Sequence, residues 1–170
     1  MNPGSSRPLV EVNNRIRSKA IGDLKVSLVP TRPDTTQYQV MRLMHHRNWR
    51  HARILNLSDI RCSKSTEFFK RYHRLEQDSG FESHTVFCGK RSAQLLLKLP
   101  RSSKTRIVLA WGLSPRLNPL IERCLSRLDP KVRLHGLLES GTKDKYRHPL
   151  PSLQKQQREW IERILRRFDA

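Results

Sequence analysis

The sequence predicts an α/β domain in which helices cover both faces of a mainly parallel sheet of four strands. Short apolar, β-branched segments alternate along the chain with longer segments whose apolar residues recur at helical spacing. Such an alternation implies right-handed crossovers and therefore a parallel order of strands. The length of 170 residues suits one domain, and because the apolar fraction of 36% is below the usual share, the core must be compact and economical.

The expected strands are short and rich in Val, Ile and Leu. Pro30 ends the first of them, and the third, which is the clearest, ends at Gly112. The four expected strands span residues 24–29, 52–57, 105–111 and 132–138.

The expected helices lie between and after these strands. Asp34 or Thr35 caps the first, which runs to about Arg47, and Ser65 caps the second. Pro115 opens another helix at a position where proline is tolerated. The later helices are expected over residues 66–77, most of 84–98 with an interruption at Gly89, 115–127 and 153–168.

The first part of the chain differs in composition from the rest. Residues 1–23 are polar and contain several arginines, so we expect a flexible basic arm before a single α/β domain over residues 24–170. No apolar run approaches the length of a membrane span and no signal-peptide core is present, so we expect a cytoplasmic protein that does not enter a membrane. Three widely spaced cysteines without a CxxC pair indicate reduced thiols, and we expect no metal or cofactor.

The charge of the chain is its most informative bulk property. Lys and Arg total 34 against 15 Asp and Glu, which gives a formal net charge of +19. A field of this size concentrates polyanions, and the planar guanidinium of Arg suits phosphate, so nucleic acid is the expected partner. The simpler interpretation is a solvated basic surface without a specific partner.

Polar segments follow each of the four expected strands. In a parallel sheet, the functional crevice lies beyond the carboxyl ends of the strands. The segments at that edge are residues 30–34, 56–61, 111–112 and 143–151, all rich in polar or conformationally special residues. The sequence therefore predicts a site there.

The same segments carry a resemblance to a known family. In chain order they are Leu28–Asp34, Asn56-Leu57 with Arg61, Ala110-Trp111-Gly112, Thr142-Lys143 and Arg147-His148-Pro149-Leu150. This series resembles the bacterial and phage family called domain of unknown function 1643, and the resemblance covers about residues 24–163.

A more distant similarity is to the uracil-DNA glycosylases. It rests on Pro33-Asp34, Ile54-Leu55-Asn56, Leu109–Gly112 and His148-Pro149, in that order. This similarity implies a three-layer α/β/α sandwich around a parallel four-stranded sheet. It also implies catalytic roles: Asp34 would position water, Asn56 would read the edge of a flipped base, and His148 would stabilise the departing oxyanion.

Basic residues around this edge are the expected phosphate ligands. They are Arg32, Arg61, Lys143, Lys145 and Arg147.

Each of the three catalytic candidates also has a structural interpretation. Asp34 can cap a helix, Asn56 can tie a strand end to a loop, and His148 can order the loop that contains it.

Three functional hypotheses follow. The first is a nucleic-acid-binding protein that uses a basic surface around the cleft. The second is an enzyme that cleaves an N-glycosidic bond of a nucleobase or nucleotide. The third is a phage or mobile-element protein that binds a host protein and uses its charge only for tethering to DNA or RNA.

Overall fold

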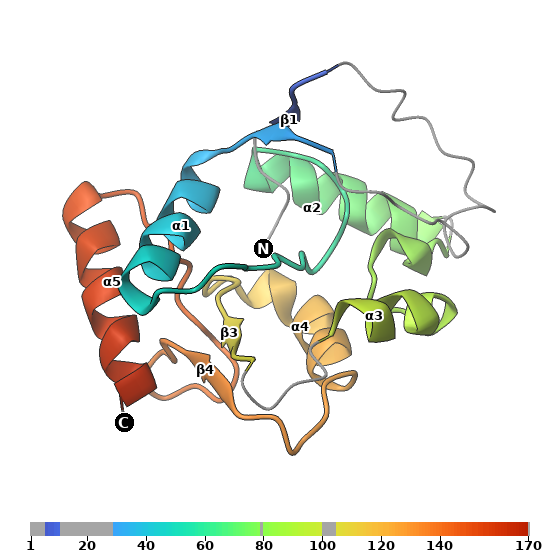
Figure 1. Cartoon of the computed structure of the whole chain (residues 1–170). Helices are drawn as coiled ribbons and strands as arrows, with labels where there is room; N and C mark the ends of the chain where they lie inside the picture. The colour runs from blue at the N-terminus through green and yellow to red at the C-terminus, as the bar shows by residue number, and fades with distance from the viewer. Residues whose placement is uncertain (1–5, 11–28, 79, 100–104, 170) are drawn as a thin grey trace. The chain divides into compact units, whose positions relative to one another are not determined.

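The computed structural model describes residues 6–10, 29–78, 80–99 and 105–169 (Figure 1). These residues form two compact units. Unit 1 comprises residues 35–55 and 105–169, and unit 2 comprises residues 6–10, 29–34, 56–78 and 80–99.

Unit 1 contains one parallel pair of strands. β3 (Ile107–Leu109) pairs with β4 (Leu134–Gly136), with Ile107 opposite Leu134. Parallel neighbours require a crossover connection, and here a 3-10 turn (Pro115–Leu117) followed by α4 (Asn118–Leu125) provides it. The arrangement is a single strand–helix–strand unit.

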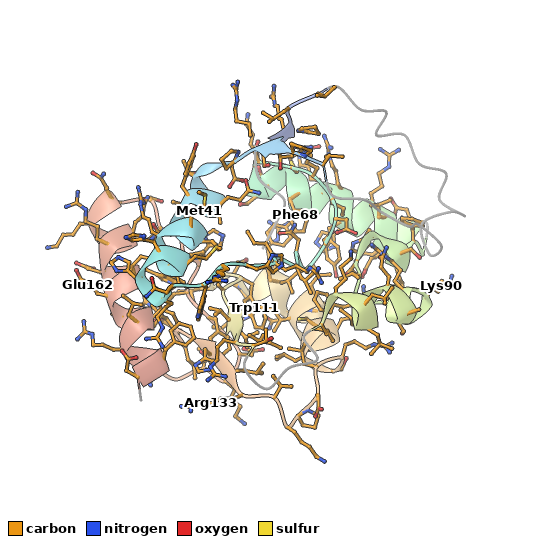
Figure 2. All side chains as sticks on the ribbon, in the orientation of Figure 1. Met41, Phe68, Lys90, Trp111, Arg133 and Glu162 are labelled. Carbon is orange, nitrogen blue, oxygen red and sulfur yellow. The ribbon has the colours of Figure 1, made fainter. Side chains whose placement is uncertain are left out.

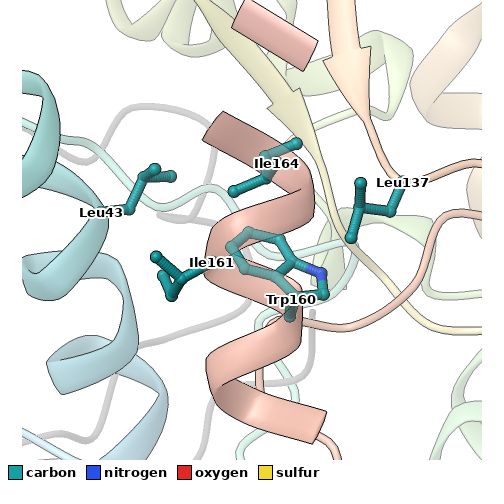
Figure 3. Close-up of a cluster of buried hydrophobic side chains, with 5 residues drawn as sticks. All are labelled: Leu43, Leu137, Trp160, Ile161 and Ile164. Carbon is teal, nitrogen blue, oxygen red and sulfur yellow. The ribbon is translucent and has the colours of Figure 1, made fainter. Parts of the chain in front are cut away.

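Two long helices pack together beside this pair. α1 (Thr35–Arg47) contacts α5 (Gln154–Asp169), and α5 also contacts β4 (Figure 1). On α5, the apolar residues recur every three to four positions and form one buried stripe. Figure 3 shows the resulting cluster, which consists of Leu43, Leu137, Trp160, Ile161 and Ile164. Full burial of each such side chain stabilises the unit by about 1.5 to 3 kcal/mol.

Asn48 ends α1. Its φ of 52° is left-handed, a conformation that Asn adopts more readily than most residues. Its N–H donates to the carbonyl of His45 (3.2 Å), and the N–H of Trp49 donates to the carbonyl of Met44 (2.9 Å). These two bonds form a Schellman motif, which satisfies carbonyls that a helix end leaves unpaired.

Unit 2 is largely helical. β1 (Arg7–Pro8) pairs with β2 (Thr31–Arg32) in antiparallel fashion. The helical elements are α2 (Ser65–His73), a π-helical turn (Arg74–Asp78), two 3-10 turns (Glu82–His84 and Gly89–Arg91) and α3 (Ser92–Lys98). The aromatic side of α2 is buried and contains Phe68, Phe69 and Tyr72.

The prediction of a four-stranded parallel sheet is wrong. In the part of the chain that the structure describes, each of two sheets has two strands, one pair antiparallel and the other parallel. Residues 52–57 form no strand, and Ala52 and Arg53 are exposed, whereas a central parallel strand is buried on both faces. The prediction of a three-layer sandwich like that of the uracil-DNA glycosylases is therefore also wrong. Residues 24–28 of the first expected strand lie outside the described residues.

The predicted helices agree more closely with the structure than the predicted strands do. The bounds of α1 and α5 lie within one residue of those expected from the sequence. The helix expected over residues 66–77 is α-helical to His73 and continues as a π-helical turn to Asp78. The expected helix at Pro115 begins as a 3-10 turn, and only the second half of residues 84–98 forms an α-helix.

Candidate functional site

The candidate site in unit 1 lies where β3 and β4 end. The N–H of Gly112 donates to the carbonyl of Tyr146 (2.8 Å), which joins the chain after β3 to the loop after β4. Within this loop, the N–H of Glu139 donates to the carbonyl of Lys145 and the N–H of Arg147 donates to the carbonyl of Leu137 (both 2.8 Å). The loop is therefore a short hairpin bound to the carboxyl edge of β3.

Two tryptophans hold this hairpin. The indole N–H of Trp111 donates to the carbonyl of Asp144 (2.8 Å), and that of Trp160 donates to the carbonyl of Arg147 (3.1 Å). Trp111 also packs edge-on against Tyr146, with ring centroids 5.5 Å apart. Because a buried indole requires a hydrogen-bond acceptor, these contacts stabilise both the core and the loop. Trp111 is labelled in Figure 2.

Glycines allow the close approach of the loop to the strands. A Cβ at Gly136 would lie 2.6 Å from the carbonyl oxygen of Leu109 and closer still to the ring of Tyr146. Gly112 has a φ of 98°, which L side chains rarely adopt. A Cβ at Gly112 would lie 3.9 Å from the Cβ of His148, so the Trp-Gly and His-Pro motifs are neighbours.

His148 orders the loop that contains it. The N–H of Leu150 donates to Nδ1 of His148 (3.1 Å), and the intervening Pro149 is almost fully buried. Since Nδ1 accepts this bond, the neutral ring carries its proton on Nε2. The observed contact corresponds to the structural interpretation of this histidine, and the catalytic role stays a prediction.

The three basic residues of the loop have different surroundings. The ammonium of Lys145 contacts the side-chain oxygen of Asn118 and lies 3.5 Å from the carbonyl of Ser114, so it ties the loop to the start of α4. Arg147 lies 2.6 Å from a carboxylate oxygen of Glu139. Lys143 is exposed.

The other predicted site residues belong to unit 2. Asp34 directly precedes α1 and is half-buried, as is Asn56. Arg32 lies in β2, where its carbonyl accepts a bond from the hydroxyl of Ser6 (3.0 Å), and both Arg32 and Arg61 are exposed. His148 therefore belongs to unit 1, whereas Asp34 and Asn56 belong to unit 2.

A buried polar network in unit 2 was not predicted from the sequence. The hydroxyl of Ser58 accepts a bond from the N–H of Ile60 (3.1 Å) and lies 2.9 Å from Nδ1 of His84. Nε2 of His84 lies 2.8 Å from a carboxylate oxygen of Glu76. Ser58 and Glu76 therefore contact both ring nitrogens of His84.

This network has the residue types of a hydrolytic triad but not its geometry. The carboxylate contacts Nε2 and the hydroxyl contacts Nδ1, the reverse of the arrangement in serine proteases. Ser58 is 0% exposed, so a substrate does not reach its hydroxyl in this conformation. We therefore assign the network to the stability of unit 2.

Arg91 extends the polar interior of unit 2. Its guanidinium is buried and donates to Asp59 (2.5 Å), the carbonyl of Ser83 (3.0 Å) and the amide oxygen of Gln94 (2.7 Å). A buried charge is tolerated when its donors are satisfied in this way. No periodicity in the sequence marks these residues, so they could not be predicted from it.

The thiol of Cys124 is poorly suited to nucleophilic chemistry. It is buried on the inner side of α4, and burial raises its pKa to about 12. Thiolate chemistry requires the opposite shift. Burial, together with the nearby carboxylate of Asp144, also raises the pKa of Tyr146.

Residues 6–10, 29–78, 80–99 and 105–169 contain no group of three His, Cys, Asp or Glu side chains that could hold a metal ion. Within these same ranges, no helix is both long and apolar enough to cross a membrane. Comparisons of the chain with family models, curated proteins and solved structures returned no match.

Proposed function

We propose that this protein binds nucleic acid through its exposed arginine and lysine side chains. One observation carries the proposal: the formal charge is +19, and most of the Lys and Arg side chains that the structure describes are at the surface. Nucleic acids present closely spaced phosphates, and neutralising them releases counterions, which supplies affinity without sequence recognition.

The distribution of charge in unit 1 favours binding of an anionic partner over a basic surface that is only solvated. Residues 35–55 contain no Asp or Glu, while Arg42, Arg50 and Arg53 of this segment are exposed. A solvated helix face usually mixes both signs, as α5 does, where Glu159 and Glu162 stand among arginines. A positive stretch without acidic residues instead favours an anionic partner.

The loop after β4 adds further candidates for phosphate contacts. Lys143 is exposed, and the guanidinium of Arg147 is half-exposed beside Glu139. In unit 2, Arg32 and Arg61 are exposed and keep their predicted role as phosphate ligands. Contacts of this kind position a protein on nucleic acid and carry no sequence information by themselves.

Fluorescence anisotropy with nuclease-treated protein tests the proposal. At low salt, we expect the protein to bind labelled duplex DNA and single-stranded oligonucleotides with dissociation constants of about micromolar or below. Neutralising the exposed pair Arg50→Gln and Lys143→Gln should weaken binding several-fold. The matched pair Arg163→Gln and Arg166→Gln removes the same charge from the mixed face of α5 and should have a smaller effect. Lack of binding to every probe at low salt would contradict the proposal.

A further inference from the structure

The outer face of α1 combines exposed aromatic and basic side chains. The inner face carries Gln39 and Leu43, which are buried where α1 packs on α5. At 3.6 residues per turn, Tyr38, Met41 and His45 fall on the opposite side of the helix. Tyr38 is 49% exposed and Met41, labelled in Figure 2, is 52% exposed.

This face is slightly concave. A shallow hollow on it is lined by Tyr38, Met41, Arg42, His45 and His46. The rings of His45 and His46 lie edge to face, with centroids 6.0 Å apart. None of the five lining residues is acidic, so the hollow suits an anion that also presents a flat apolar surface.

Arg42 is oriented by a buried amide. Its guanidinium donates to the side-chain oxygen of Gln39 (2.9 Å). The side-chain nitrogen of Gln39 in turn donates to the carbonyl of Gln157 on α5 (2.6 Å), and Gln39 is only 1% exposed. Because Gln39 is fixed in the core, Arg42 loses less conformational freedom when it binds a ligand.

The presence of Tyr38 and Arg42 on this face is not explained by a contribution to the stability of α1. Basic residues in the last turn, such as His45 and His46, favour the negative end of the helix dipole. Arg42 lies before that last turn and Tyr38 lies near the start of the helix, where a cation or a half-exposed ring contributes little to folding. Their place on one face therefore points to a ligand.

We infer that this face binds single-stranded nucleic acid, with the ring of Tyr38 stacked on an unpaired base and Arg42 and His45 on phosphates. The inference rests on the proposed function and specifies the strand form. Bases in a duplex are stacked on one another, whereas a single strand leaves their faces accessible to an aromatic side chain. From Tyr38 to His45 the face extends about 10 Å, which accommodates a short run of nucleotides.

Three probes separate stacking from charge. They are a labelled oligothymidylate of about 15 nucleotides, a duplex of the same length, and heparin, which is polyanionic but has no bases. We expect Tyr38→Ala to weaken binding to the oligothymidylate by about five- to twentyfold and to leave duplex and heparin binding unchanged. Tyr38→Phe keeps the ring and should bind all three probes as the unchanged protein does.

Leu153→Ala is the matched control, since Leu153 is an apolar residue of unit 1 outside α1 and is more exposed (61%) than Tyr38 (49%). Arg42→Ala should weaken binding to all three probes, because it removes a charge. The inference is overturned if Tyr38→Ala leaves oligothymidylate binding unchanged, or weakens binding to all three probes equally, while the proposed function stands. If the unchanged protein binds neither nucleic acid at low salt, the proposed function itself fails.

Discussion

His135 is a buried titratable residue of unit 1. It lies in β4, and its ring centroid is 4.6 Å from that of Phe168 on α5. Burial lowers the pKa of this imidazole, and the charges of Arg133 and Arg106 act in the same direction. A hydrogen bond with the backbone of Arg167 acts in the opposite direction but does not compensate. The folded protein therefore protonates this ring only at a lower pH than an ordinary histidine.

This shift predicts a loss of stability in acid. In the unfolded chain, the histidine takes up its proton near pH 6.5, whereas the folded state takes it up only at lower pH. Below pH 6.5 the unfolded state thus binds more protons, so the free energy of unfolding should fall until the folded pKa is passed. Between about pH 7.5 and 5.5, the melting temperature of His135→Gln should decline less than that of the unchanged protein.

The exposed His51, which lies outside any helix, provides the control for this measurement. His51→Gln removes a histidine that solvent reaches in both states, so its melting temperature should follow the unchanged protein across the same pH range. An equal decline in His135→Gln and in the unchanged protein would show that His135 does not contribute.

His84 should contribute far more to the free energy of unfolding than an exposed histidine of the same unit. His84→Ala leaves Ser58 and Glu76 without their partner and opens a cavity, which should lower the free energy of unfolding by about 2 to 4 kcal/mol. His73→Ala, at an exposed position of α2, should change it by less than about 0.5 kcal/mol. Chemical denaturation measures both. A small effect at His84 would mean that the network of Ser58, His84 and Glu76 does not stabilise unit 2.

At the scale of elements, the contact between β4 and the loop depends on a missing side chain. Gly136→Ala would place a methyl group against Tyr146 and the carbonyl of Leu109. We expect it to lower the free energy of unfolding by about 1 to 3 kcal/mol, since neither neighbour is a flexible chain end. Ser140→Ala, an exposed change in the same loop, should be nearly neutral. Equal stability of the two variants would contradict the close packing described for this edge.

The elements that could be predicted from the sequence are those with long periodic patterns. α5 has Trp160, Ile161 and Ile164 on one face, so both its type and its bounds were predictable. Short apolar runs are ambiguous, because four or five residues specify an extended chain but not a pairing partner. Residues 52–57 illustrate this: the segment is mainly apolar but forms no strand, and the N–H of Asp59 just beyond it bonds to the carbonyl of His84 in a 3-10 turn.

The candidate site was predictable only in part. We expected four segments, residues 30–34, 56–61, 111–112 and 143–151, at the carboxyl edge of one parallel sheet. The structure places Trp111-Gly112 and the His148 motif side by side in unit 1, and the first two segments belong to unit 2. The roles of the two indole N–H groups were not predictable, because they depend on loop carbonyls far along the chain. The network of Ser58 and His84 was missed for the same reason.

At the scale of the whole molecule, charge is the dominant property. A net charge of +19 opposes compaction by self-repulsion, and the ion pairs offset this only locally. Exposed pairs such as Arg71 with Glu67 contribute little to stability. An anionic partner would neutralise the excess, so the charge that disfavours folding is the charge that favours binding.

The salt dependence of binding tests this account most directly. The affinity for duplex DNA is measured by anisotropy from low to physiological salt and plotted as log affinity against log salt concentration. If about six phosphates are neutralised, the slope should be about −5, because each contact releases condensed counterions. An affinity that does not change over this range, or that is absent at low salt, would contradict the claim that the basic surface binds nucleic acid.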